Sequence, residues 1–176
     1  MARQIAAPGN VNDLRSAIVQ ARQVRTDNPR WGEVSTQIAQ WEERVETTED
    51  GPILNKADQL AGQGTAQSLK LAIQEARRIR SGRALSEQAQ SRINRWQKQV
   101  EAIEDRPFLD EARRLATVGD LTGAIAIASR ISPERSLYDE AQNDLNSWRD
   151  QQQNQTRLQE ASNIAQSGTA NDLARA

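Results

Sequence analysis

Three tryptophans at nearly equal intervals constrain how this chain can fold. Trp41, Trp96 and Trp148 are 55 and 52 residues apart, and an apolar residue lies three positions before each of them. Aligning the chain on these tryptophans also brings a phrase of the form Leu-x-x-Ala-x-x-(Leu/Ile)-Ala-x-x-Gly into register, at Leu54, Leu109 and Leu158. Periods of 20–50 residues or slightly more are typical of arrays built from one supersecondary unit. The sequence therefore predicts a tandem array of about three and a half units.

A second phrase fixes the boundaries of the units. Leu-x-x-x-Ile-x-x-Ala begins at Leu14, Leu69 and Leu121, and its first residue returns at Leu173. The glycine and this leucine are five residues apart in the other copies but only two apart at Gly119 and Leu121. A loop between packed elements tolerates such a deletion of three residues. We expect repeat 1 at 1–53 with its first helix truncated to a tail containing Ile5, Ala6 and Gly9, repeat 2 at 54–108, repeat 3 at 109–157, and a partial repeat 4 at 158–176.

Each unit contains three helical patterns. The first, at 109–116, places Leu109, Ala112, Leu115 and Ala116 on one helix face. The second follows the glycine and has Leu121, Ile125, Ala128 and Ile131 as its apolar face, and the third runs from about Ser86 through Trp96 to Ile103. No stretch alternates with period two, so we expect an all-α fold, an elongated solenoid or a chain of short helical bundles.

Turn and cap residues separate these helices. Pro52 and Pro107 suit the first turn of a helix, and Asp50 and Asp105 suit its N-cap. The second helix is expected to have an N-cap from this set: Asn10, Thr65, Asp120 or Thr169. The preceding glycines are expected in the left-handed C′ conformation, at Gly64, Gly119 and Gly168.

Composition argues against catalysis. The chain has no cysteine and no histidine, which removes thiolate chemistry, the commonest metal ligand and the commonest general base. Gly62-x-Gly64 lacks a preceding strand and indicates a helix end rather than a nucleotide loop. The carboxylates of Glu104, Asp105, Asp110 and Glu111 stand beside an expected helix start, where capping explains them better than acid catalysis. We expect no enzyme activity, no cofactor and no metal site.

The apolar content suits an extended assembly better than a sphere. Only 36% of the residues are hydrophobic and the mean hydropathy is −0.80, and each unit of an array buries only a stripe against its neighbours. No apolar run approaches the roughly 20 residues that span a bilayer, so we expect a soluble segment.

The tryptophans have two interpretations. They could form an aromatic docking surface, but their equivalent positions beside apolar partners favour packing between helices. Trp31 differs, because it aligns with Ser86 and Tyr138, and such a variable position suits partial exposure. It could contact a partner, or pack over the turn between the second and third helices.

Basic residues gather in the second repeat. The segment from Lys70 to Val100 contains eight basic residues and only two acidic ones. The candidates for binding a partner or an anion are Arg77, Arg78, Arg80, Arg83, Arg92, Arg95 and Lys98. A basic stripe can hold phosphate backbones or anionic lipid heads. The alternative, favoured by a net charge of −1 and few aromatic residues, is solvated helix faces paired with neighbouring carboxylates, so nucleic acid is not the expected partner.

The phrases themselves resemble known helical repeats. The segment from Leu109 to Ala128 resembles a tetratricopeptide helix pair, although that family repeats every 34 residues or so. Across nearly the whole chain the sequence resembles long cyanobacterial proteins that carry the phrases at 9–18, 103–107 and 119–121 in series. These proteins often carry the label chromosome segregation ATPase, and the resemblance implies a membrane-spanning helix ahead of the repeats and an excerpt of a longer repeat region. The sequence contains no Gly-x-x-x-x-Gly-Lys-(Ser/Thr) loop, so ATPase activity is not expected of this segment.

Two functions remain compatible with the sequence. The leading hypothesis is a protein-interaction scaffold built from helical repeats. The alternative is binding of an anionic membrane surface or nucleic acid through the basic stretch at 70–98.

Overall fold

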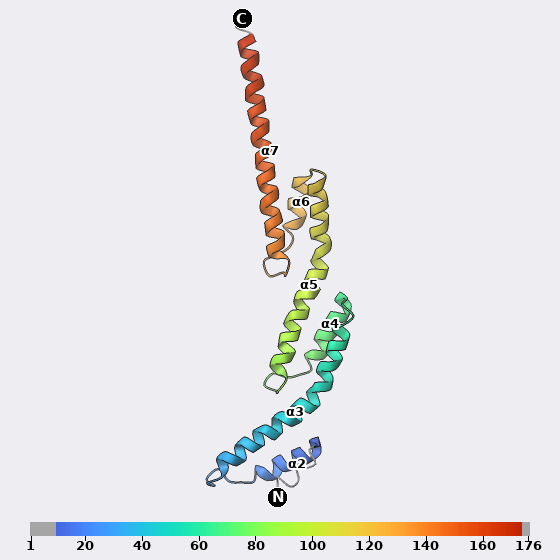
Figure 1. Cartoon of the computed structure of the whole chain (residues 1–176), viewed down its shortest axis with the longest axis vertical. Helices are drawn as coiled ribbons and strands as arrows, with labels where there is room; N and C mark the ends of the chain where they lie inside the picture. The colour runs from blue at the N-terminus through green and yellow to red at the C-terminus, as the bar shows by residue number, and fades with distance from the viewer. Residues whose placement is uncertain (1–9, 174–176) are drawn as a thin grey trace. The chain divides into compact units, whose positions relative to one another are not determined.

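The computed structural model describes residues 10–173, and side chains as far as Ser167. These residues form six helices in three pairs of a short and a long helix (Figure 1): α2 Val11–Ala21 with α3 Trp31–Ala61, α4 Ala66–Ala76 with α5 Ser86–Thr117, and α6 Leu121–Ala128 with α7 Tyr138–Leu173. No strand occurs in the part of the chain that is described. The all-α prediction is confirmed. The chain divides into two compact units, Met1–Val100 and Glu101–Ala176.

The long helices begin at equivalent sequence positions. Trp31, Ser86 and Tyr138 are the first residues of α3, α5 and α7, as the alignment on the tryptophans implies. The expected start of the third helical pattern at Ser86 is therefore confirmed.

The expected break between the third helical pattern of one repeat and the first helical pattern of the following repeat is wrong. Asp50 and Pro52 lie inside α3, and Asp105 and Pro107 lie inside α5. The aspartates are not N-caps, and the second and third predicted repeats each contain one short helix and part of two long ones. An interior proline removes one helical hydrogen bond and normally kinks or breaks the helix.

Packing on both sides of each proline explains why the helix continues. Asp50, which precedes Pro52, is 4% exposed, and Leu54, which follows it, is also 4% exposed. Leu54 packs in a cluster with Ile79 and Ala89, from the connection after α4 and the start of α5. Tertiary contacts therefore override the local preference of proline to begin a helix.

The caps of the short helices agree with the sequence, except at the C-terminal end. Asn10, Thr65 and Asp120 each accept a hydrogen bond from the third backbone N–H beyond them. Gly64 and Gly119 have φ of 70° and 89°, as a left-handed C′ residue requires. By contrast, α7 runs through Gly168 and Thr169 to Leu173, so the predicted helix end and N-cap there are wrong. The tail at Ile5, Ala6 and Gly9 lies outside the described residues.

The first unit holds its core beneath the short helices. Trp41 is 8% exposed and packs with Ile38 and Val45 against the apolar face of α2. Trp96 is 3% exposed and packs with Ile93 and Val100 against α4, where the end of α3 also meets the cluster. The prediction of core packing is confirmed for both tryptophans.

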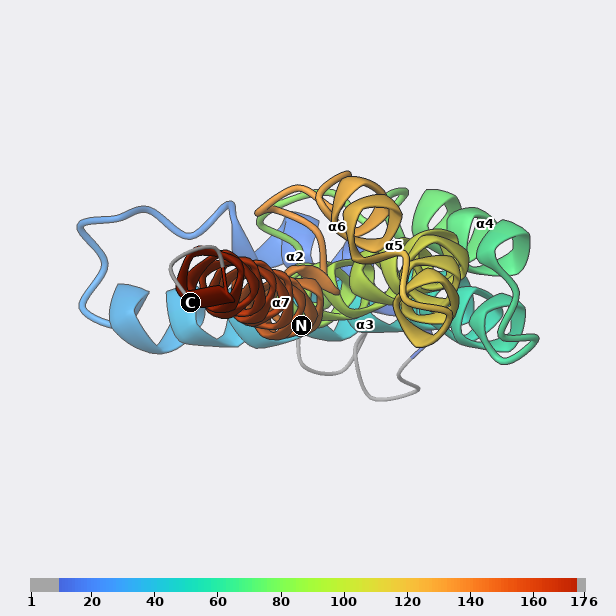
Figure 2. The same ribbon diagram turned by 90° about the horizontal axis from the view of Figure 1, so that it is seen from above.

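The second unit repeats this arrangement around α6. Trp148 is 7% exposed and packs with Leu145 against α6, and Ala112 of α5 joins the same cluster. Figure 2 shows α6 beside α5, and Figure 1 shows it beside α7. The Leu-x-x-Ala face of one long helix and the Trp face of the next thus enclose the short helix between them.

The glycine that ends α5 gives a test of this local structure. Gly119 carries φ of 89° and a Cβ there would meet no atom within 4 Å, so its substitution costs conformational energy alone. Gly119→Ala should lower the free energy of unfolding by about 1 kcal/mol in denaturant titrations. Gly51→Ala is the matched control: Gly51 lies inside α3 with open space at its Cβ, so that change should raise the free energy by about 0.5–1 kcal/mol. Equal effects of the two changes would contradict the assigned helix ends.

Candidate interaction surfaces

An arginine in the connection between α4 and α5 binds the buried aspartate of α3. Nε of Arg83 donates to Oδ2 of Asp50 over 2.6 Å, and Nη2 donates to Oε2 of Glu49 over 2.9 Å. The next backbone N–H, at Ala84, donates to Oε2 of Glu46 over 2.8 Å. We call these contacts the first clamp. It joins the connection of one helix pair to the long helix of the preceding pair.

The same contacts recur in the second unit. Arg135, in the connection between α6 and α7, donates through Nε to Oδ2 of Asp105 over 2.7 Å and through Nη2 to Oδ1 over 2.8 Å. Nη2 also donates to Glu104 over 3.2 Å, and the N–H of Ser136 donates to Glu101 over 3.1 Å. In this second clamp, the acceptors and the donor occupy the positions that the repeat alignment makes equivalent to those of the first.

Burial strengthens the clamps. Asp50 and Asp105 are 4% and 7% exposed, and no buried side-chain nitrogen or oxygen among the described residues lacks a hydrogen-bond partner. Hydrogen bonds to Asp50 and Glu49 raise the pKa of Arg83, and the hydrogen bond to Asp105 does the same for Arg135. The hydrogen bond from Arg83 in turn lowers the pKa of Glu49 below its ordinary value. An arginine that donates two hydrogen bonds to carboxylates is held in one orientation as well as being stabilised, so each clamp fixes the position of the connection that carries its arginine.

A second set of ion pairs joins successive long helices. In the first unit the arginine lies on the later helix and the aspartate on the earlier one, and in the second unit the two are reversed. In the first unit Arg92 of α5 donates to Asp58 of α3 over 2.9 Å. In the second unit the equivalent positions hold Asp144 of α7 and Arg113 of α5, whose Nε and carboxylate lie 2.7 Å apart. The fold thus accepts either polarity at one contact between helices.

The predicted basic surface is only partly available. Arg83 and Arg92 are half-buried in the contacts above, and Arg78 pairs with Glu75 over 2.5 Å. Lys98 is also engaged within the chain. The others are exposed, namely Arg77, Arg80 and Arg95. Trp31 is half-buried at the start of α3.

Sequence reasoning missed the pairing of the buried aspartates with the arginines of the connections. Asp50 and Arg83 are 33 residues apart, and Asp105 and Arg135 are 30 apart. The signal was present, because both members of the pair recur at equivalent repeat positions.

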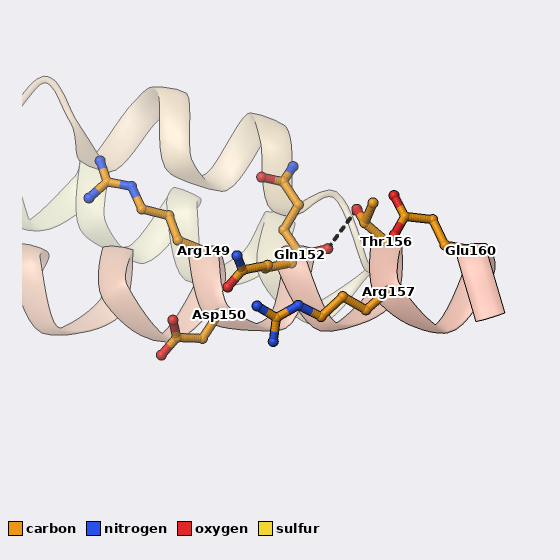
Figure 3. Close-up of a pocket in the computed structure, with 7 residues that line it drawn as sticks. Arg149, Asp150, Gln152, Thr156, Arg157 and Glu160 are labelled. Carbon is orange, nitrogen blue, oxygen red and sulfur yellow. Dashed lines mark hydrogen bonds between the residues drawn. The ribbon is translucent and has the colours of Figure 1, made fainter.

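A hollow of about 590 Å³ lies on the middle of α7, between Arg149 and Glu160. Figure 3 shows Arg149, Asp150, Gln152, Thr156, Arg157 and Glu160 projecting from this one helix. Gln152 donates to Thr122 of α6 over 3.0 Å, which places the start of the hollow beside the short helix. This lining contains both signs of charge and no buried titratable group.

Neither a metal site nor a membrane span is found in residues 10–173. No group of three or more potential metal ligands gathers there. None of the helices described is long and apolar enough to cross a bilayer.

Comparison with family models, with curated proteins and with solved structures gave no match to this chain.

The first clamp and a separate ion pair, in which Arg106 of α5 donates to Glu140 of α7 over 2.8 Å, predict how stability depends on pH. Hydrogen bonds from Arg83 and Arg106 lower the pKa values of Glu49 and Glu140 below the ordinary 4.5. A carboxylate with a lowered folded-state pKa stabilises the fold above its unfolded pKa and loses this contribution as the pH falls through the folded value. The free energy of unfolding should therefore be level near neutral pH and decline below about pH 4.5.

Urea titrations at several pH values measure this decline. Arg83→Gln should make it shallower, because Glu49 loses the arginine that lowers its pKa most and keeps only the contact with Arg15. Arg77→Gln is the matched control, since Arg77 is exposed nearby, and should leave the slope as it is. A slope that is the same in all three proteins would show that the clamp carries no linkage to pH.

Proposed function

We propose that this chain is a non-catalytic protein-interaction scaffold made of tandem helical repeats. The recurrence of the clamp carries the proposal: the same acceptors on a long helix bind the same donors of the following connection in each unit. A contact that repeats between successive helix pairs is what a stacked array requires, because one pair alone cannot bury its apolar faces.

The outward surface suits binding rather than chemistry. The apolar faces of the short helices are turned into the clusters around Trp41, Trp96 and Trp148. The opposite faces of α2 and α4 expose polar side chains such as Arg15 and Lys70 beside the apolar side chains of Val19 and Leu71. The clamp carboxylates are already neutralised by arginine, so they serve to hold the fold. Solvent-facing side chains on regularly spaced helices form the kind of extended surface that repeat proteins offer to partners.

The basic stretch fits this role less well as an anion site. Arg83 and Arg92 each donate to an aspartate within the fold, so a phosphate would have to displace a partly buried carboxylate. Breaking such a contact leaves the carboxylate without its partner, which is costly. We therefore propose protein partners, with Trp31 and the exposed arginines as contributors to the docking surface.

Capture from an extract of the source cell tests the proposal. The immobilised chain should retain defined proteins at about 0.05 M and about 0.5 M salt, because apolar docking resists ionic strength whereas phosphate contacts do not. Trp31→Ala should weaken retention, while Trp31→Phe, which keeps an aromatic ring, should weaken it less. Anionic vesicles and duplex DNA serve as comparison ligands.

The proposal is overturned if the chain captures no protein and instead binds vesicles or DNA at low salt with release at higher salt. That result would mean that the basic stretch at 70–98 binds an anionic membrane surface or nucleic acid.

A further inference from the structure

A hollow of about 310 Å³ lies between the end of α3 and the first half of α5, within the first unit. We call it the Trp96 hollow. Six residues line it, the first three from α3 and its C-cap and the last three from α5: Asp58, Ala61, Gly62, Arg95, Trp96 and Gln99. The volume is at the small end of ligand pockets, which suits one side chain of a partner.

The indole N–H of Trp96 has no hydrogen-bond partner among the residues that the structure describes. Trp96 is 3% exposed, and a tryptophan buried to this degree usually donates its N–H to an acceptor of the protein. Within the described residues every buried side-chain nitrogen has a partner, so this nitrogen is not buried and reaches the surface. Because Trp96 lines the hollow, its N–H is a donor held there without an acceptor.

Arg95 supplies the charge of the Trp96 hollow. It is exposed and forms no ion pair within the described part of the chain. The carboxylate in the lining, on Asp58, already accepts from Nε of Arg92 at both oxygens, over 2.9 and 3.1 Å. That pair is neutral as a whole. Arg95 therefore remains as a single unbalanced positive charge beside the indole N–H and the side-chain amide of Gln99.

These donors suit a carboxylate better than a phosphate. A carboxylate is planar, carries one negative charge and accepts at two oxygens, so one oxygen can face the guanidinium of Arg95 and the other the indole N–H. A phosphate ester carries about two negative charges and is bound by clusters of arginine. The Trp96 hollow offers one unpaired arginine, and the oxygens of Asp58 in its wall repel a second negative charge.

We propose that the Trp96 hollow binds an aspartate or glutamate side chain of a partner protein, with Arg95 pairing with the carboxylate and the indole N–H of Trp96 donating to it. The inference deepens the proposed function and rests on it, since it states the chemistry of one contact between the scaffold and its partner. Tryptophan and arginine are the residue types that most often dominate binding at protein interfaces. A single exposed ion pair contributes little by itself, so capture at high salt depends on the rest of the docking surface.

Proton–nitrogen NMR correlation spectra of the intact chain test the proposal, because the indole N–H of each tryptophan gives its own signal. The probe is a blocked glycine peptide that carries one glutamate, and the matched probe carries glutamine instead. The glutamate peptide should shift the Trp96 signal downfield and to saturation, since the N–H gains an acceptor, and the glutamine peptide should bind about threefold more weakly or less. The Trp148 signal is the internal control, because Ser147 stands at the position of Arg95.

Two substitutions separate the contributions of the charge and of the N–H. Arg95→Gln should weaken binding of the glutamate peptide about threefold or more, because an exposed ion pair is lost. Trp96→Phe keeps an aromatic ring in the core and removes the donor, so it should also weaken binding, followed at the side-chain amide signal of Gln99. Arg80→Gln is the matched control: Arg80 is exposed on the connection and does not line the hollow, so its loss should leave binding unchanged. Circular dichroism should show the parent helix content in each variant.

Three results would overturn the inference. They are a Trp96 signal that stays in place at every concentration of the glutamate peptide, a shift that Arg95→Gln leaves unchanged, and an equal shift produced by inorganic phosphate. The last result would assign the hollow to phosphate-bearing ligands. Capture from the extract by the parent chain tests the scaffold proposal separately, so a failed peptide titration together with successful capture removes this inference alone.

Discussion

The packing of each helix pair on the one before it depends on a buried aspartate inside a long helix. Asp50 and Asp105 lie two residues before a proline, where a helix is weak, and each binds an arginine from the following connection. A buried carboxylate is costly unless it is paired, so the arginine must occupy one place. The clamp thereby positions the short helix over the Leu-x-x-Ala face, and the aliphatic and tryptophan clusters fill the space beneath.

The sequence alone predicted the helical class, the equivalence of Trp31, Ser86 and Tyr138, the buried tryptophans and the caps at Thr65 and Gly119, because these depend on local spacing. It failed at Pro52 and Pro107, where a proline preceded by aspartate has the local signature of a helix start. The helix continues there because of contacts with residues some 30 positions away along the chain, which local patterns do not record. For the same reason, the sequence alone could not tell which arginines of the basic stretch are exposed and which form ion pairs within the fold.

The proposed scaffold function follows from how these contacts recur. Two clamps of one polarity join successive helix pairs, whereas the contact between long helices reverses polarity from one unit to the next. Recurrence supports a scaffold, since the same contact joins a long helix to the following connection within each unit.

A double-mutant cycle on Asp50 and Arg83 tests the central role of the clamp most directly. Arg83→Met should lower the free energy of unfolding by about 1–3 kcal/mol, because it strands a buried carboxylate. Adding Asp50→Leu removes that carboxylate, so the double variant should be more stable than the sum of the two single changes predicts. The exposed pair of Arg114 and Glu111, within one helix, provides the reference cycle and should show little coupling. Coupling of about 1 kcal/mol or more at the clamp is the predicted result, and effects that add to within about 0.5 kcal/mol would contradict a central role for the clamp.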